Sequence, residues 1–154
     1  MTETIEFMPF LSIITVTKDN LKGLRATHSS ITQQSSSDYE WIVVDGASND
    51  QTVEFLQEIK ADYTIEPDKS LFDAMNKGIT RAREAYKLFL NAGDTFADSL
   101  TIEHLVKAAT NSKFSRLQLR YKICESGRLC LRIIHRINLL HRLQSRPMHV
   151  RSRR

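Results

Sequence analysis

Four short apolar runs recur within the first 90 residues, and each ends in small, hydroxyl-bearing or acidic residues. The runs cover residues 11–17, 41–44, 63–65 and 86–90 and are rich in Ile, Val and Leu. This pattern is typical of strands that are buried on both faces and lead into loops. Segments of helical length, residues 20–34, 49–60 and 71–83, separate the runs. The alternation predicts βαβ units, and therefore an α/β fold with a mostly parallel sheet.

Right-handed crossovers place the carboxyl ends of the predicted strands along one edge of the sheet. We expect a Rossmann-like, doubly wound sheet with the strand order 3-2-1-4, in which the first and fourth strands are neighbours. Ligands of such sheets bind in the crevice where the strand order reverses. The turns that contain Thr15, Asp45 and Asp94 would border that crevice. The spacing alone does not identify the ligand.

Charge is distributed unevenly along the 154 residues, although the formal net charge is only +4. Residues 113–154 contain 12 Lys and Arg and one acid, Glu125, a net charge of +11 that leaves −7 for residues 1–112. We therefore expect a folded domain over residues 8–111 and a basic tail over residues 112–154 that is helical or disordered.

The tail has three interpretations. In residues 129–145, Leu129, Ile133 and Ile137 recur at near-helical spacing among Arg residues, as in amphipathic helices that lie on anionic membranes. The abrupt change in composition also fits a truncated or frameshifted end. Nucleic-acid binding is disfavoured, because no aromatic stacking platform or recognition motif accompanies the Arg residues.

The N-terminal region predicts the compartment. The apolar stretch at residues 11–16 is too short to span a bilayer, and residues 1–8 lack the basic-then-apolar order of a secretory signal. We expect a cytoplasmic protein that contacts the cytoplasmic face of the inner membrane peripherally if the tail forms a surface helix.

Four motifs occur in register over about residues 10 to 98: SIITVTKDN, EWIVVDGASNDQTVEFL, IEPDKSLFDAMNKGITRA and YKLFLNAGD. Together they resemble the inverting family 2 glycosyltransferases with a GT-A fold, and among them the bacterial polysaccharide enzymes related to those of colanic acid synthesis. The resemblance implies transfer of a sugar from a nucleoside diphosphate donor, most simply a UDP-sugar, to a glycan or lipid-linked acceptor.

The resemblance also implies a donor site. Thr15, Thr17 and Asp45 would line the pocket for the base and ribose, where a carboxylate accepts hydrogen bonds from uracil or a ribose hydroxyl. Asp68 and Asn76 resemble positions of the family's donor loop, and Asp73 is a weaker match to the same region.

The loop from Asn91 to Asp94 stands where the family carries its acidic metal motif, which holds Mg²⁺ or Mn²⁺ against the diphosphate. Asn91 and Gly93 occupy positions where many members have carboxylates, so Asp94 is the predicted metal ligand and Asn91 a predicted donor-side residue. An inverting transfer also needs a general base, and the sequence does not identify one. The alternative hypothesis is therefore a catalytically incompetent donor-binding remnant or a membrane-associated scaffold.

Overall fold

The computed structural model describes residues 10–84, 86–110, 119–123 and 129–133. Its strands are β1 (Leu11–Thr17), β2 (Tyr39–Asp45), β3 (Asp62–Ile65), β4 (Tyr86–Phe89), β5 (Thr95–Phe96), β6 (Leu119–Ile123) and β7 (Leu129–Ile133). Its helices are α1 (Leu21–Thr32), α2 (Thr52–Glu58), α3 (Leu71–Arg81) and α4 (Thr101–Thr110).

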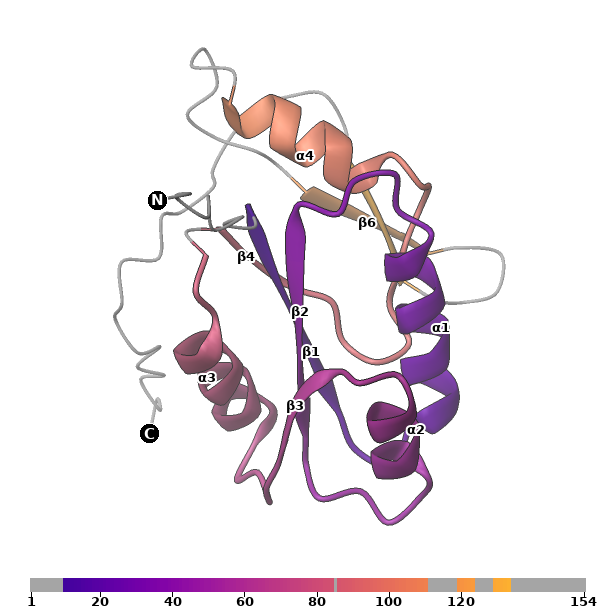
Figure 1. The fold of residues 1–154 in the computed structure, drawn as a ribbon, viewed down its shortest axis with the longest axis vertical. Helices are drawn as coiled ribbons and strands as arrows, with labels where there is room; N and C mark the ends of the chain where they lie inside the picture. Colours follow the sequence, from indigo (N-terminus) through magenta and orange to yellow (C-terminus); the bar gives the residue numbers. More distant parts are fainter. Residues whose placement is uncertain (1–9, 85, 111–118, 124–128, 134–154) are drawn as a thin grey trace, which may run out of the picture.

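The main sheet confirms the predicted topology. Its four strands are parallel in the order β3-β2-β1-β4, so β1 lies between a strand nearby in sequence and a distant one. Helices α1 and α2 cover one face of this sheet and α3 covers the other (Figure 1). Because all four strands run the same way, their carboxyl ends lie at one edge, as expected for a sheet built from βαβ units.

Apolar residues on β1 and β2 form the centre of the core. Ile13, Ile14, Val43 and Val44 are fully buried, which fits strands covered on both faces. Helix α3 approaches β1 so closely that a Cβ atom at Gly78 would lie 2.4 Å from Cγ2 of Ile14. Only glycine therefore fits this crossing without a shift of the helix or the strand.

The N-termini of α3 and α2 are stabilised differently. Ser70 is the N-cap of α3, and its side chain accepts a hydrogen bond from the Asp73 amide. Ser48 and Asn49 have the chemistry of N-caps, but α2 begins later, after Gln51, whose side chain makes no capping hydrogen bond. The side chain of Ser48 instead bonds to residues outside the helix, as described below.

A second, three-stranded sheet follows, with β7 between β5 and β6. Strand β7 runs parallel to β5 and antiparallel to β6, so its pairing joins residues on both sides of the expected boundary at residue 111. The amphipathic helix predicted over residues 129–145 is wrong for residues 129–133, which form β7. Apolar and basic or small residues alternate through LRYKI and LCLRI, a period of two that favours strands. Residues 134–154 lie outside the described residues.

None of the helices in the described part of the chain is long and apolar enough to cross a membrane.

Candidate functional site

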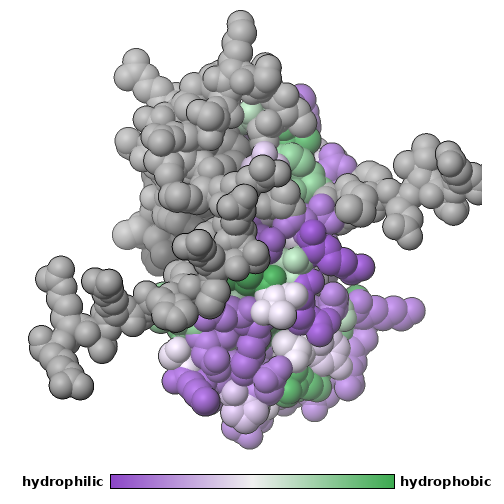
Figure 2. All heavy atoms as spheres, turned by 90° about the vertical axis from the view of Figure 1, so that its left-hand side faces the viewer, coloured by the Kyte–Doolittle hydropathy of each residue, from purple (hydrophilic) through white to green (hydrophobic). Residues whose placement is uncertain are grey.

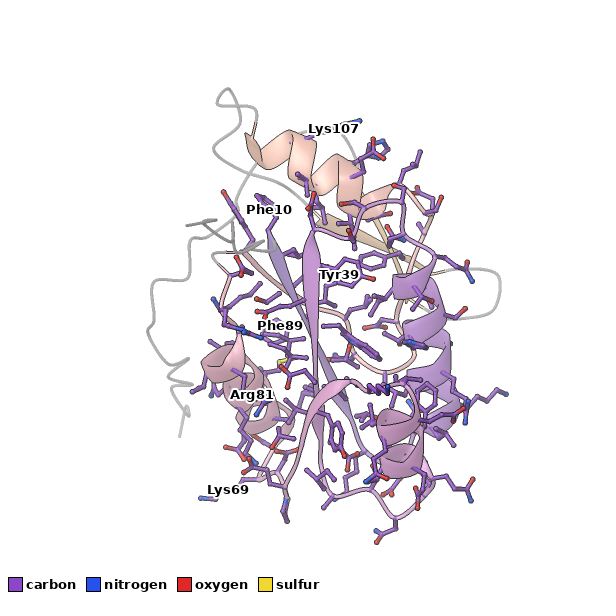
Figure 3. All side chains as sticks on the ribbon, in the orientation of Figure 1. Phe10, Tyr39, Lys69, Arg81, Phe89 and Lys107 are labelled. Carbon is purple, nitrogen blue, oxygen red and sulfur yellow. The ribbon has the colours of Figure 1, made fainter. Side chains whose placement is uncertain are left out.

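Loops from four strands meet at the carboxyl edge of the main sheet, and backbone hydrogen bonds extend the strand pairing into them. The amide of Gly46 donates to the carbonyl of Thr17 (2.9 Å), and that of Ala92 donates to Val16 (3.1 Å). The Glu66 amide likewise donates to the carbonyl of Asp45 (3.0 Å). In Figure 3, Lys69 of the β3–α3 loop lies at this end of the sheet, whereas Phe10, before β1, lies at the opposite end. The predicted edge therefore exists, and the loops on it are neighbours.

Thr15 lies inside the sheet and does not face this edge. Its hydroxyl accepts a hydrogen bond from Nε1 of Trp41 (2.9 Å) and donates to the carbonyl of Leu90 (2.7 Å). The residue has no exposed surface. This arrangement gives Thr15 a structural role between β1, β2 and the end of β4, in contrast to the ligand-lining role that the family resemblance implies.

Thr17 and Asp45 lie directly opposite each other at the ends of β1 and β2. Thr17 is buried, and its hydroxyl has no hydrogen-bond partner among the described residues. Asp45 is fully buried, and both of its carboxylate oxygens accept hydrogen bonds from Ser48, one from the amide (2.9 Å) and one from the hydroxyl. An unpartnered buried hydroxyl is costly and calls for a water or ligand partner. Asp45, in contrast, supports the loop that follows it.

Asp68 lies beside the turn that follows β2. Its Oδ2 atom would be 3.0 Å from a Cβ atom at Gly46, so the carboxylate nearly touches the backbone there. Its Oδ1 atom accepts a hydrogen bond from Nζ of Lys77 (2.7 Å), which also pairs with Glu66 (3.2 Å) and Asp73 (3.5 Å). The carboxylates of Asp68 and Glu66 raise the pKa of Lys77, so its ammonium stays charged and holds the β3–α3 loop in place.

The face of the molecule on the α3 side is mainly hydrophilic near this edge (Figure 2). Asn76 lies on α3 and is half-buried. Among the described residues, no hydrogen bond joins its side chain to the other predicted site residues, although its carbonyl accepts one from the Thr80 hydroxyl (3.0 Å). The structure therefore places Asn76 on the neighbouring helix without linking it to the predicted site.

The loop from Asn91 to Asp94 forms a closed turn. The Asp94 amide donates to the Asn91 carbonyl (2.9 Å), and the Asn91 amide donates to Oδ2 of Asp94 (3.2 Å). Gly93 has a positive φ of 107°, a conformation that favours glycine. The hydroxyl of Thr27 on α1 accepts from the Gly93 amide (2.9 Å) and lies 2.8 Å from the Asp94 carbonyl, to which it donates. Helix α1 thus fixes the conformation of the turn.

The side chains of this turn offer oxygen donors of the kind that Mg²⁺ and Mn²⁺ prefer. Oδ1 of Asn91 is buried and has no hydrogen-bond partner among the described residues. Partial burial raises the pKa of Asp94, and the hydrogen bond from the Asn91 amide opposes this rise. A bound cation would stabilise the ionised carboxylate and satisfy the Asn91 oxygen, so both residues fit a divalent metal.

The fit is limited by the number of protein ligands. In the part of the chain that the structure describes, no three His, Cys, Asp or Glu side chains gather as a metal site. Mg²⁺ often binds through one or two carboxylates while phosphates and waters complete its shell. The turn therefore suits a cation that arrives with a phosphate-bearing ligand.

Three residues at this edge were not among the predicted site residues. Lys18 is exposed and its side chain lies against Gly46, while Ser48 and Lys77 hold two predicted carboxylates in place. Lys18 directly follows the β1 strand in the sequence, a position that could have identified it. The partners of Ser48 and Lys77 become visible only in three dimensions.

A doubly wound parallel sheet with polar loops at its carboxyl edge is the architecture of α/β domains that bind ligands in the crevice at this edge. Residues 12–150 match the family described as glycosyl transferase family 2, and the chain belongs to this family. The predicted family is thereby confirmed. The narrower resemblance to colanic acid enzymes stays a prediction.

Relatives with similar sequences are mycobacterial. An uncharacterised glycosyltransferase of Mycobacterium tuberculosis is 34% identical over 104 residues, which cover 65% of this chain and 40% of the relative. A PGL/p-HBAD biosynthesis glycosyltransferase of Mycobacterium bovis is 33% identical over 100 residues, covering 61% of this chain and 39% of the relative. The chain thus spans about two fifths of the length of these relatives.

Solved structures with the same fold share less sequence. Staphylococcus aureus TarS in complex with UDP-GlcNAc superposes with a TM-score of 0.58 at 19% identity, over 64% of this chain and 30% of that one. A mannosyltransferase from Pyrobaculum calidifontis in complex with GDP-Man and Mn²⁺ gives a TM-score of 0.59 at 18% identity, over 71% and 34%. These similarities support the GT-A fold that the sequence predicted.

Proposed function

We propose that this chain binds a nucleoside diphosphate sugar at the carboxyl edge of the main sheet and provides the donor side of a glycosyl transfer. The observation that supports this most directly is the pair of unpartnered buried oxygens, Oγ1 of Thr17 and Oδ1 of Asn91, at the ends of the adjacent strands β1 and β4. Both atoms lack a protein partner among the described residues, and a polar ligand in the crevice would supply one.

A UDP-sugar is the proposed donor, and a GDP-sugar is the second choice. The UDP-GlcNAc complex of TarS and the GDP-Man complex of the mannosyltransferase support a nucleotide-sugar partner. In this chain, Lys18 supplies an exposed cation beside Gly46 for the diphosphate. Thr17 contributes its free hydroxyl, and Asp45 and Asp68 shape the loops on either side of Gly46.

We further propose that Asn91 and Asp94 bind Mg²⁺ or Mn²⁺ together with the diphosphate. When bound, the cation neutralises charge that develops on the departing diphosphate. The residues of the chain contribute by holding the turn closed through Thr27 and by presenting an ionised carboxylate. The presence of Mn²⁺ in the mannosyltransferase complex supports this choice of metal.

The proposed acceptor is a glycan or a lipid-linked sugar in polysaccharide synthesis. We propose a cytoplasmic location, with peripheral contact between the basic C-terminal residues and the cytoplasmic face of the inner membrane. The net charge of +11 over residues 113–154 supports attraction to an anionic surface, and the similarity to a mycobacterial PGL/p-HBAD biosynthesis glycosyltransferase supports a biosynthetic role. No described residue is assigned the role of general base.

Thermal unfolding with and without nucleotide tests the donor site. UDP with Mn²⁺ should raise the melting temperature, because a ligand that binds only the folded state stabilises it by mass action. Asp94→Ala should remove the part of the shift that depends on the metal and retain the shift with UDP alone. Glu58→Ala, an exposed acid on α2, is the matched control and should behave as the wild type. A folded chain whose melting temperature does not respond to millimolar UDP or GDP would refute the donor site.

The second candidate function is a donor-binding domain without catalysis. The chain spans about 40% of the length of its relatives, and no described residue is assigned the role of general base. Sugar transfer to an added acceptor separates the two functions, because both bind nucleotide and only an enzyme turns over. Expressed as residues 1–154, the chain should bind donor and transfer it slowly or not at all.

A further inference from the structure

Reciprocal hydrogen bonds join the two loops that follow β1 and β2. The Asp19 amide donates to the Ser48 hydroxyl (2.8 Å), and the Asn49 amide donates to Oδ1 of Asp19 (2.7 Å). The Leu21 amide also donates to Oδ2 of Asp50 (3.0 Å). We call this set, Asp19, Leu21, Ser48, Asn49 and Asp50, the interloop clasp.

Ser48 has a fixed direction of hydrogen bonding within the clasp. The Asp19 amide can only donate, so the Ser48 oxygen must act as its acceptor. The single hydroxyl proton is then available for Oδ1 of Asp45, while the Ser48 amide donates to Oδ2. One serine therefore holds both oxygens of a fully buried carboxylate and connects them to the β1–α1 loop.

Two residues of the loops that the clasp joins have unfavourable backbone conformations. Asp19 has a φ of 48° and Ala47 a φ of 58°, in the left-handed region that residues other than glycine seldom adopt. Such conformations persist where surrounding contacts over-determine them, and they cluster at functional sites. Here the strained residues directly follow Lys18 and Gly46, and the Lys18 side chain lies against Gly46.

We propose that Ser48 is a positioning residue of the donor site, which acts by fixing Asp45 and by holding the Lys18–Asn20 and Gly46–Asp50 loops in register. This role rests on the proposed donor function. Ser48 fixes the conformation of the two loops that contact the nucleotide. Its loss should therefore raise the dissociation constant for UDP and leave unchanged the factor by which Mn²⁺ increases the affinity. Loss of a hydrogen bond to a buried charged group should weaken UDP binding by about tenfold to a hundredfold.

Isothermal titration with UDP, with and without Mn²⁺, tests this role on the full chain. Ser48→Ala should weaken UDP binding by about the same factor in both conditions, and Ser48→Thr, which keeps a hydroxyl, should restore most of the affinity. Ser35→Ala is the matched control, because Ser35 bonds to Glu103 on α4, away from the crevice, and this variant should bind as the wild type. Asp19→Ala, at an exposed position, breaks the clasp from the other loop and should also weaken binding.

The outcomes separate this role from the donor function. A wild-type chain that does not bind UDP or GDP overturns the donor function, and the role of Ser48 with it. Wild-type binding that Ser48→Ala leaves unchanged overturns only the positioning role. If Ser48→Ala does not fold, unchanged UDP affinity in Asp19→Ala overturns it. Failure of Ser48→Thr to recover more affinity than Ser48→Ala also contradicts a role for the hydroxyl.

Discussion

Asp94 is less stable as an ion in the folded chain than in the unfolded chain, because burial raises its pKa above the usual value of 3.8. Well below that value both states are protonated and the residue has no effect on stability. As the pH rises through the folded-state pKa, the ionised carboxylate becomes progressively more costly to the fold. At neutral pH, Asp94 therefore destabilises the chain in the absence of metal.

Removal of the Asp94 charge should therefore stabilise the chain at neutral pH. Asp94→Asn should raise the melting temperature at pH 7 by a few degrees or less, because the amide keeps an acceptor for the Asn91 amide and carries no charge. The gain should shrink as the pH falls and vanish near pH 3. Melting curves from pH 3 to 8 measure it. An equal gain at every pH would contradict an electrostatic origin.

Gly78 determines how helix α3 packs on the sheet. A methyl group at this position meets Cγ2 of Ile14 at 2.4 Å and Cγ2 of Val44 at 3.4 Å. Overpacking costs about 1–3 kcal/mol, and the 2.4 Å approach places this site at the upper end of that range. After the roughly 1 kcal/mol that alanine gains in helix propensity, Gly78→Ala should destabilise the chain by about 1–2 kcal/mol. Urea unfolding measures the difference.

A control for Gly78→Ala lies on the same helix, α3. Thr80 is exposed, and Thr80→Ala removes a hydroxyl and places a better helix former at the surface. Its effect should stay within about 0.5 kcal/mol of the wild type. If Gly78→Ala proves as mild as Thr80→Ala, the close approach of α3 to β1 is not required for stability.

The elements of the main sheet could be predicted because their signals are local. Runs such as LSIITV are short, apolar and bounded by polar residues, and the crossover rules then leave few possible strand orders. The start of α2 could not be predicted in this way. Ser48 has the chemistry of an N-cap, but tertiary contacts with Asp19 and Asp45 recruit its hydroxyl instead.

The positions of the site loops could be predicted from the sequence, but the contacts of individual side chains could not. The Asn91–Asp94 turn and the place of Asp45 at the end of β2 follow from the motifs and the topology. The burial of Thr15 does not, because its partners Trp41 and Leu90 are distant in sequence. The strand at residues 129–133 was missed because Leu129, Ile133 and Ile137 have near-helical spacing over the longer segment, and pairing with β5 and β6 selects the strand.

At the scale of the whole molecule, the basic C-terminal residues predict a salt-sensitive interaction. Residues 134–154 contain six Arg and no Asp or Glu. The chain should bind vesicles that contain anionic lipids at low salt and dissociate as salt rises. Salt screens the attraction between exposed charges, and the Debye length is only about 10 Å at 0.1 M. Vesicle sedimentation over a range of salt concentrations measures this.

Deletion of residues 134–154 is the matching variant, since it retains β6 and β7. The shortened chain should bind vesicles more weakly, because six of the 12 basic residues of 113–154 are removed, and it should keep the melting-temperature shift with UDP. Vesicle binding that the deletion leaves unchanged would place the membrane contact outside residues 134–154. Loss of the UDP response would instead show that these residues contribute to the donor site.

The central position of β1 also has a consequence for the order in which the molecule is made. β1 can pair with β2 once Asp45 has been added, but its other neighbour, β4, is not available until Tyr86 to Phe89 have been added. Until then, β1 presents an unpaired edge to other nascent chains, and long-range parallel pairing of this kind is slow. The same late event brings the Asn91–Asp94 turn to the end of β1. Pairing of β4 with β1 and placement of the Asn91–Asp94 turn at the end of β1 are therefore one step.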